Sequence, residues 1–488
     1  MDSLKNKAVR GIKWSFIDNL ANSGITFIVG IFLARILSPA EFGILGLIAV
    51  FIAISNSIVD GGFATALIRK SNASDEDYNT VFYSNLIFAF GLTVILILAS
   101  NGIAVFFKEP ILRYITPVMS LVLIINSFTI IQRTIFVKKI DFKTQAKISL
   151  IASIGSGIIG ISLALLKFGV WSLVAQQLSR QALLSVFLWL FSTWRPKFTF
   201  SKESFKELFG FGSKILIANL VNTFYQNIFY TIIGKLYSTE QLGKYTRADQ
   251  FNTIFTNNLT LVIQKVSFPI LSSIQEDRDK LTFVFRKTLI YSSIITFAFV
   301  LALAAIAKPL ILILIGYKWI DSVQYLQIMC LYGMLYPLQI VNLNMLNVQK
   351  RSDLILKLEI VKKIIFVPVF IVGFYFSLID MLWAAVIYYY IEYFLNSFYS
   401  KRYFGYGTLK QIIDLFPIYL ISFLVAISIW SITLLNLSNI STLIIQVFLC
   451  VLLFPLSYKL IGLVEYKELK QIVLKLLSEN TILKMFTK

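Results

Sequence analysis

The feature that most constrains this chain of 488 residues is a series of long apolar stretches that continues from one end to the other. We count fourteen, each near the ~20 residues that a helix needs to cross the ~30 Å hydrocarbon layer of a bilayer. Backbone groups inside lipid must bond within the protein, which a helix achieves. The stretches run over 14–37, 42–67, 81–100, 112–136, 148–166, 170–189, 208–236, 242–270, 288–306, 325–348, 360–377, 381–400, 415–435 and 442–463. The sequence therefore predicts an all-α integral membrane protein with about 14 transmembrane helices.

Composition excludes several classes of protein and site. Charged residues make up only 14% of the chain and the mean hydropathy is +0.78, which excludes a soluble protein. Histidine is absent from the sequence, which rules out Ser-His-Asp catalysis and histidine metal sites. Cys330 and Cys450 both lie inside apolar runs, so we expect neither a disulfide nor a metal site, and no cofactor.

The basic residues alternate between loops. If the N-terminus is cytoplasmic, 33 of the 45 Lys and Arg residues lie on the inner side and nine on the outer side. This is the positive-inside pattern, and it places both termini in the cytoplasm. The net charge of +20 is thereby explained by topology and does not indicate nucleic-acid binding. The tail 464–488 carries apolar and basic stripes and is predicted to be an amphipathic helix on the inner leaflet.

The chain also repeats itself at a spacing of 200 residues. Between positions 19 and 43, six of 25 residues are identical to those 200 positions later, among them Ser38/Ser238 and Gly43/Gly243. The spacing covers six segments, so the first and seventh helices run in the same direction. We expect two parallel six-helix bundles related by an axis along the membrane normal, with two extra C-terminal helices. The predicted divisions are 1–194 (first lobe), 195–207 (cytoplasmic linker), 208–404 (second lobe), 405–463 (helices 13 and 14) and 464–488 (tail).

Polar residues inside apolar segments mark the candidate site, because a charge at mid-bilayer costs about 2.5–3.5 kcal/mol unless it meets water or a partner. The eighth segment is too polar to face lipid and is predicted to line an aqueous cavity, together with parts of the first and seventh segments. A segment that does not span is the alternative. The predicted cavity residues are Arg247, Asp249, Gln250, Asn257, Asn258 and Lys265 in the eighth segment, with Asn219 and Gln226 in the seventh.

Two isolated charges lie near the middle of the membrane, in two segments that are counterparts in the repeat. Arg180 in segment 6 is a candidate for binding an anionic group, and Glu392 in segment 12 for coupling transport to a proton or cation. A buried, paired structural charge is the equally weighted alternative for each. Arg35, at the outer end of segment 1, is a further cavity candidate, although snorkelling to the interface also explains it.

Local strings resemble the Wzx-type polysaccharide flippases, which form the polysaccharide-transporter branch of the multidrug/oligosaccharidyl-lipid/polysaccharide exporter superfamily. The similarity covers about 1–280. The strings that carry it are Ala34–Gly43, Asp60–Phe63, Ala66–Ile68, Gly169–Leu173, Trp194–Pro196, Phe209–Gly212, Leu242–Tyr245 and Phe268–Ser272.

The resemblance implies a substrate of undecaprenyl-diphosphate carrying an oligosaccharide, moved from the inner to the outer leaflet by alternating access. It also implies a cationic cavity for the diphosphate, a polysaccharide polymerase and a chain-length regulator as partners, and a proton or sodium gradient or the membrane potential as the driving force. A multidrug or cation antiporter of the same superfamily is the alternative. A membrane glycosyltransferase or polymerase fits less well, because the longest stretch outside the membrane, about 190–207, is too short for a catalytic domain.

Overall fold

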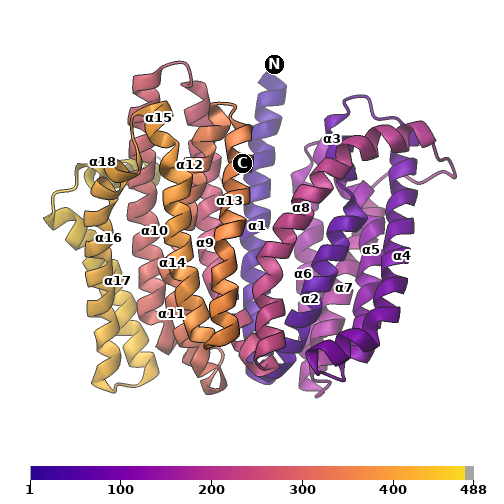
Figure 1. The fold of residues 1–488 in the computed structure, drawn as a ribbon, viewed down its shortest axis with the longest axis horizontal. Coiled ribbons are helices and arrows are strands. Elements are labelled where there is room, and N and C mark those ends of the chain that lie inside the picture. The colour runs from indigo at the N-terminus through magenta and orange to yellow at the C-terminus, as the bar shows by residue number, and fades with distance from the viewer. Residues whose placement is uncertain (1, 479–488) are drawn as a thin grey trace. The chain divides into compact units, whose positions relative to one another are not determined.

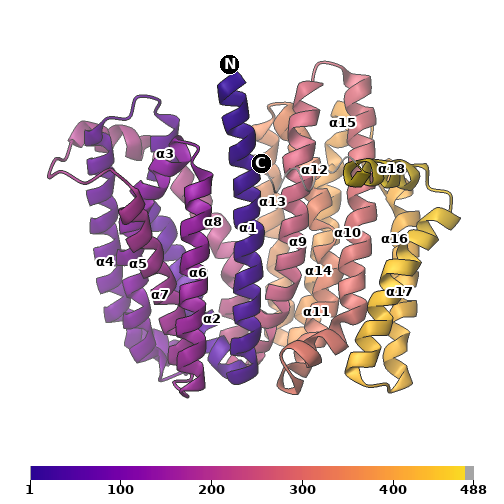
Figure 2. The same cartoon turned by 180° about the vertical axis from the view of Figure 1, so that it is seen from behind.

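The computed structural model describes residues 2–478, with the side chains of all of these except 2–10, 12, 352, 404 and 472–478. Within this part of the chain the regular structure is entirely helical (Figures 1 and 2). The long helices are α1 (Asp2–Ile36), α2 (Pro39–Asp60), α4 (Asp75–Phe107), α5 (Leu112–Lys138), α6 (Phe142–Leu165), α7 (Val170–Phe191), α8 (Lys202–Leu236), α9 (Thr239–Ser273), α10 (Arg278–Leu314), α11 (Ile320–Gly333), α12 (Tyr336–Val348), α13 (Ser352–Tyr375), α14 (Leu378–Phe398), α16 (Thr408–Trp430), α17 (Asn439–Leu460) and α18 (Val464–Ser478). The short ones are α3 (Phe63–Arg69), α15 (Ser400–Phe404) and the 3₁₀ turns Tyr317–Trp319 and Ser431–Leu435.

The prediction of an all-α membrane protein is confirmed. Ten stretches of the described residues are long and apolar enough to cross a membrane, and each coincides with one of the fourteen predicted segments. The other four predicted segments are also helices, namely α7, α8, α9 and α13, but they are too polar for the same criterion. The polar helices are therefore the ones that need water or a protein partner beside them.

Two predicted segments are interrupted in ways that the hydropathy did not indicate. The second segment ends at Gly61 and Gly62, which both adopt the left-handed conformation (φ 56° and 71°) that glycine accepts without strain, and the short helix α3 follows. The tenth is divided into α11 and α12, and Pro337 lies in the first turn of α12. Pro337 suits a helix start because it has no backbone N–H to leave unbonded.

The helices pack into two compact units, Met1–Thr246 and Arg247–Lys488. In the first unit α4 packs on α5, α6 on α1 and α7, and α2 on α8. In the second, α10 packs on α11, α16 and α17, and α13 packs on α14. Helix α8 thus belongs to the first unit, whereas the predicted boundary between lobes lies at 195–207 and stays a prediction. In the predicted tail, α18 is helical, and residues 479–488 lie outside the described residues.

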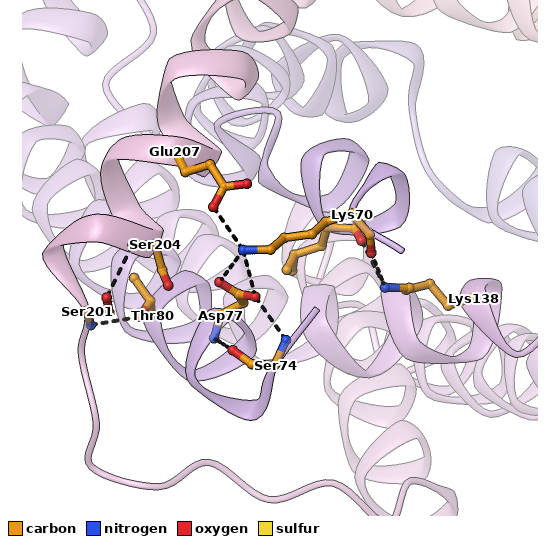
Figure 3. Close-up of polar contacts among 9 residues, drawn as sticks. Lys70, Ser74, Asp77, Thr80, Lys138, Ser201, Ser204 and Glu207 are labelled. Carbon is orange, nitrogen blue, oxygen red and sulfur yellow. Dashed lines mark hydrogen bonds and ion pairs between the residues drawn. The ribbon is translucent and has the colours of Figure 1, made fainter. Parts of the chain in front are cut away.

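The predicted inner end of the first unit is fixed by a cluster of ion pairs (Figure 3). Lys70 Nζ donates to Asp77 at the start of α4 (3.1 Å) and to Glu207 on α8 (2.9 Å). Lys138 Nζ donates to the carbonyl oxygens of Leu67 (3.1 Å) and Lys70 (2.7 Å), at the C-terminal end of α3. The hydrogen bond to Glu207 raises the pKa of the Lys70 ammonium above its ordinary value, so the lysine stays charged. These contacts attach the first turns of α8 to the α3–α4 turn.

Candidate functional site

Three of the four long helices that are too polar for the spanning criterion carry most of the predicted site. Nine of the eleven predicted residues lie on α7, α8 and α9, and the other two, Arg35 and Glu392, lie on α1 and α14. The unit boundary falls within α9, between Thr246 and Arg247. Residues 219 and 226 of α8 therefore belong to the first unit with Arg180, while the predicted residues of α9 belong to the second.

Arg180 is a half-buried cation of the first unit. It lies ten residues into α7, and its Nε atom is buried with no hydrogen-bond acceptor among the described residues. Asp18 on α1 and Arg133 on α5 are both close enough to interact with it electrostatically. The group therefore contains two guanidinium groups and one carboxylate, and it carries an excess of one positive charge.

The carboxylate of this group is held in place by neutral side chains. Asn22 Nδ2 donates to Asp18 Oδ1 (2.7 Å), and Ser149 on α6 also bonds to Asp18. Ser153 Oγ in turn donates to Asn22 Oδ1 (2.6 Å). These bonds fix Asp18 on the side of α1 that packs against α6. One carboxylate cannot neutralise two arginines, so the arrangement has the electrostatics of an anion site.

A chain of amides lies beside Arg180. Gln181 Nε2 donates to Asn126 Oδ1 on α5 (2.7 Å), and Asn126 Nδ2 donates to Asn56 Oδ1 on α2 (2.8 Å). This chain links α7, α5 and α2 at the level of Arg180. The sequence interpretation missed these amides and treated Arg133 only as a topology marker. The available signal was position, because residue 133 lies inside the predicted segment 112–136.

The predicted polar residues of α8 are exposed, whereas both ends of the helix are fixed by contacts with the rest of the first unit. Asn219 and Gln226 are exposed on the first unit, and both ends of α8 pack on that unit. At the predicted outer end Lys235 Nζ donates to the Phe106 carbonyl (2.6 Å) and lies 4.0 Å from the centre of the Phe106 ring. Arg35, its counterpart in the repeat, is exposed in the last turn of α1. Their positions suit both snorkelling and a role at the outer mouth.

The predicted residues of α9 divide into those bonded to their own helix and those facing outwards. Asn258 Nδ2 donates to the Ile254 carbonyl (2.6 Å), and the Asp249 carbonyl accepts from Thr253 (2.8 Å). Asn257 is exposed. Arg247, Asp249, Gln250 and Lys265 are half-buried.

Glu392 is not an isolated charge. Its carboxylate lies 3.1 Å from Lys362 Nζ on α13, and the two side chains are only 13% and 4% exposed. Lys362 also pairs with Glu359, which lies 3.9 Å from Lys363 Nζ. The cluster of two lysines and two glutamates is neutral. Of the alternatives for Glu392, the pairing favours a structural charge, and the sequence interpretation missed Lys362 as its partner because it was assigned to an inner loop.

The described residues contain no group of three or more Cys, Asp or Glu side chains placed to hold a metal ion. The first unit brings two guanidinium groups and one carboxylate together beside amides and hydroxyls. The second unit carries a neutral ion-pair cluster and the polar face of α9.

Comparison with known proteins identifies the family of this chain. Residues 32–324 match the family model described as polysaccharide biosynthesis protein, which is more than half of the chain. The chain belongs to the polysaccharide biosynthesis protein family. Among members named for their pathways, it is 24% identical over 357 residues to the teichuronic acid biosynthesis protein TuaB of Bacillus subtilis (strain 168), covering 72% of this chain and 74% of TuaB. It is also 24% identical over 377 residues to the lipopolysaccharide biosynthesis protein WzxC of Escherichia coli (strain K12), covering 76% of each.

The fold of this polysaccharide biosynthesis protein is similar to that of solved membrane transporters. The structure of the lipid II flippase MurJ in an inward closed conformation superposes with a TM-score of 0.75 and 14% identity, covering 94% of this chain and 99% of MurJ. At this identity the likeness concerns the fold alone. The resemblance inferred from the local strings is confirmed at the level of the family, and the protein is a multi-pass membrane protein.

Proposed function

We propose that this protein is a flippase that moves undecaprenyl-diphosphate-linked oligosaccharide repeat units from the inner to the outer leaflet of the bacterial plasma membrane. Family membership and the relatives named for teichuronic acid and lipopolysaccharide biosynthesis support a role in polysaccharide export. The fold shared with a lipid II flippase supports a lipid-linked substrate. A transporter also accounts for a chain that is almost entirely membrane helices without a large polar catalytic domain.

The observation that carries the proposal is the uncompensated positive charge around Arg180. A lipid-linked diphosphate is an anion that lies at the membrane interface, and two guanidinium groups facing one carboxylate are suited to bind it. The buried Nε of Arg180 supplies a donor that has no partner among the described residues. The same charge disfavours the cationic substrate of a multidrug antiporter at this position.

The proposal also covers the remaining parts of the transport cycle. Asn219 and Gln226, which are exposed on α8, supply hydrogen bonds for the sugars as they cross. A proton or sodium gradient or the membrane potential drives the export. A polysaccharide polymerase and a chain-length regulator receive the product, and both termini of the flippase lie in the cytoplasm.

The test is transport by the purified protein in proteoliposomes, with a fluorescent undecaprenyl-diphosphate oligosaccharide as the probe. Arg180→Gln removes the charge and keeps a polar side chain. A hydrogen bond to a charged group contributes about 1.5–3 kcal/mol, so the rate should fall by roughly 10- to 100-fold. Arg402→Gln, at an exposed arginine of the second unit, removes the same charge and should leave the rate unchanged. Equal rates for both variants would eliminate Arg180 as the anion site, and a wild-type protein without transport would eliminate the function.

A further inference from the structure

The first turns of α2 and α9 touch through their backbones. A Cβ atom added to Gly43 would lie 1.8 Å from the carbonyl oxygen of Thr239, and one added to Gly243 would lie 1.7 Å from the carbonyl oxygen of Pro39. No side chain fits at such distances, so the contact requires glycine at both positions. The four residues form two pairs related by the repeat spacing of 200, and each glycine faces the first residue of the other helix.

One turn further along, the same relation holds between directly equivalent residues. A Cβ atom on Gly46 would lie 3.1 Å from Cγ2 of Thr246. Residues that are equivalent in two copies of a repeat touch each other only where a two-fold axis passes between them. The start of α2 and the start of α9 therefore meet on a local pseudo-two-fold axis, inside the unit Met1–Thr246.

The contact is closely packed on all sides. A Cβ atom on Gly234, in the last turn of α8, would lie 2.0 Å from Cδ2 of Leu47. Both helices begin with a serine cap, since Ser38 accepts from the Glu41 amide (3.4 Å) and Ser238 from the Gln241 amide (3.1 Å). Backbone contact at this spacing leaves no room for water between the helix ends.

The position of the contact relates it to the transport path. The basic residues predict that the α1–α2 and α8–α9 turns lie at the outer face, and both turns lie at the same end of the first unit (Figure 1). Gln226 lies ten residues below the end of α8, or about 15 Å along the helix. A polar group that moves outwards along α8 from Gln226 arrives at the start of α9, where Gly243 closes against α2.

We propose that the reciprocal contact of Gly43 and Gly243 is the outer gate of the transporter, which opens when the start of α9 separates from α2. The proposal rests on the transport function proposed above. Its closing contacts at the glycines are backbone and methyl contacts, each individually weak, and opening also releases the hydrogen bond from Thr239 Oγ1 to Glu109 Oε1 (2.9 Å), which ties the start of α9 to the α4–α5 turn.

The experiment locks the contact with a disulfide in a background in which Cys330 and Cys450 are replaced by Ala. Gly46→Cys with Thr246→Cys places two thiols across the axis, at a spacing that a disulfide spans. The matched control joins Gly157→Cys on α6 to Val29→Cys on α1, where the added Cβ lies 3.6 Å from the Val29 Cβ. This control bridges two helices within the predicted first lobe, where a gate has no need to open.

Transport in proteoliposomes is measured after oxidation and again after reduction. A gate predicts that oxidation of the 46–246 pair stops transport, that reduction restores it, and that the 29–157 pair transports in both states. Full transport by the oxidised 46–246 pair would show that the contact is static packing and would overturn the proposal. Loss of transport in the reduced state of every variant and in the wild type would instead refute the proposed function.

A second measurement does not depend on transport. Gly43→Ala should push the two helix ends apart and increase the labelling of a cysteine at Gln226 by an impermeant thiol reagent applied from outside, several-fold over the parent protein. Gly91→Ala is the control, because its added methyl group meets nothing within 4 Å. Equal labelling of the two variants would contradict the gate.

Discussion

The ion pair of Glu392 with Lys362 allows a structural charge to be separated from a coupling site. The perturbation is Glu392→Gln, which keeps the shape of the side chain and removes its charge. Lys362 is only 4% exposed, so its ammonium then loses one of its two carboxylate partners without gaining water. Removing one partner of a buried pair costs about 3–5 kcal/mol.

The expected loss of stability in Glu392→Gln depends on the other charged residue beside Lys362. Glu359 remains beside Lys362 and compensates part of the loss, so we expect the lower limit, about 3 kcal/mol. This corresponds to roughly a 100-fold change in the unfolding equilibrium. In a thermal scan of a chain of 488 residues, with about 2.1 cal/mol/K of unfolding entropy per residue, it corresponds to a fall of about 3 °C in Tm. The matched control is Glu276→Gln, an exposed glutamate for which we expect a change within about 0.5 kcal/mol.

The assay is denaturant unfolding of the purified protein in mixed micelles, followed by transport at imposed proton and sodium gradients. The double variant Glu392→Gln with Lys362→Met should recover most of the lost stability, because it removes the uncompensated ammonium as well. A Glu392→Gln single variant as stable as wild type would refute the account of a buried structural pair. If transport by the Glu392→Gln variant no longer depends on a proton or sodium gradient, Glu392 is a coupling residue. Its ion pair with Lys362 is then part of the coupling.

Three further predictions concern other parts of the molecule. Arg133→Gln should slow transport of the lipid-linked probe, but less than Arg180→Gln does, because Arg133 is exposed; equal transport to wild type would remove it from the anion site. A cysteine at Asn257 in a cysteine-free background should react with a water-soluble thiol reagent, and complete protection would argue against an aqueous lumen beside α9. Hydrogen bonds from Lys287 and Tyr291 lower the pKa of Glu468, so its contribution to holding α18 on α10 is present above its ordinary value of 4.5 and lost as the pH falls through the lowered pKa. Proteolysis of α18 should therefore increase in acid, and Glu468→Gln should increase it already at pH 7; a variant with the wild-type pH profile would contradict this.

The helices were predictable because lipid imposes a simple rule on sequence. A helix that crosses the hydrocarbon layer needs about 20 apolar residues, and this rule identified ten of the segments directly. The other four, α7, α8, α9 and α13, were also counted as apolar stretches, although they are too polar for the spanning criterion. For the eighth segment, which is α9, the alternation of basic residues gave independent support, since omitting this segment would invert every loop beyond it. The interruption at Gly61 and Gly62 was invisible to hydropathy, because it depends on backbone conformation.

The partners of the buried charges were not predictable from the sequence. Lys362 and Glu392 are 30 positions apart on different helices, and their pairing depends on how α13 and α14 rotate about their axes. The same applies to Arg180 and its neighbours on α1 and α5. Hydropathy shows where along a helix a charged residue lies, but it does not show toward which neighbouring helix the side chain points. Arg133 and Lys362 were therefore taken as topology markers, although both lie within predicted segments.

The repeat contains information that becomes clear only with the structure. The register of 200 residues is carried by six identities in 25 positions, which by itself does not explain why those positions remained alike. The contact between α2 and α9 supplies a reason for Gly43 and Gly243. Each glycine faces a carbonyl at the start of the other copy, so a side chain added in either copy would collide with the backbone of its counterpart. Because a local two-fold axis relates the two helix ends, the close contact that excludes a side chain at Gly43 also excludes one at Gly243. This symmetry accounts for glycine in both copies of the repeat at the place where the two helix ends meet.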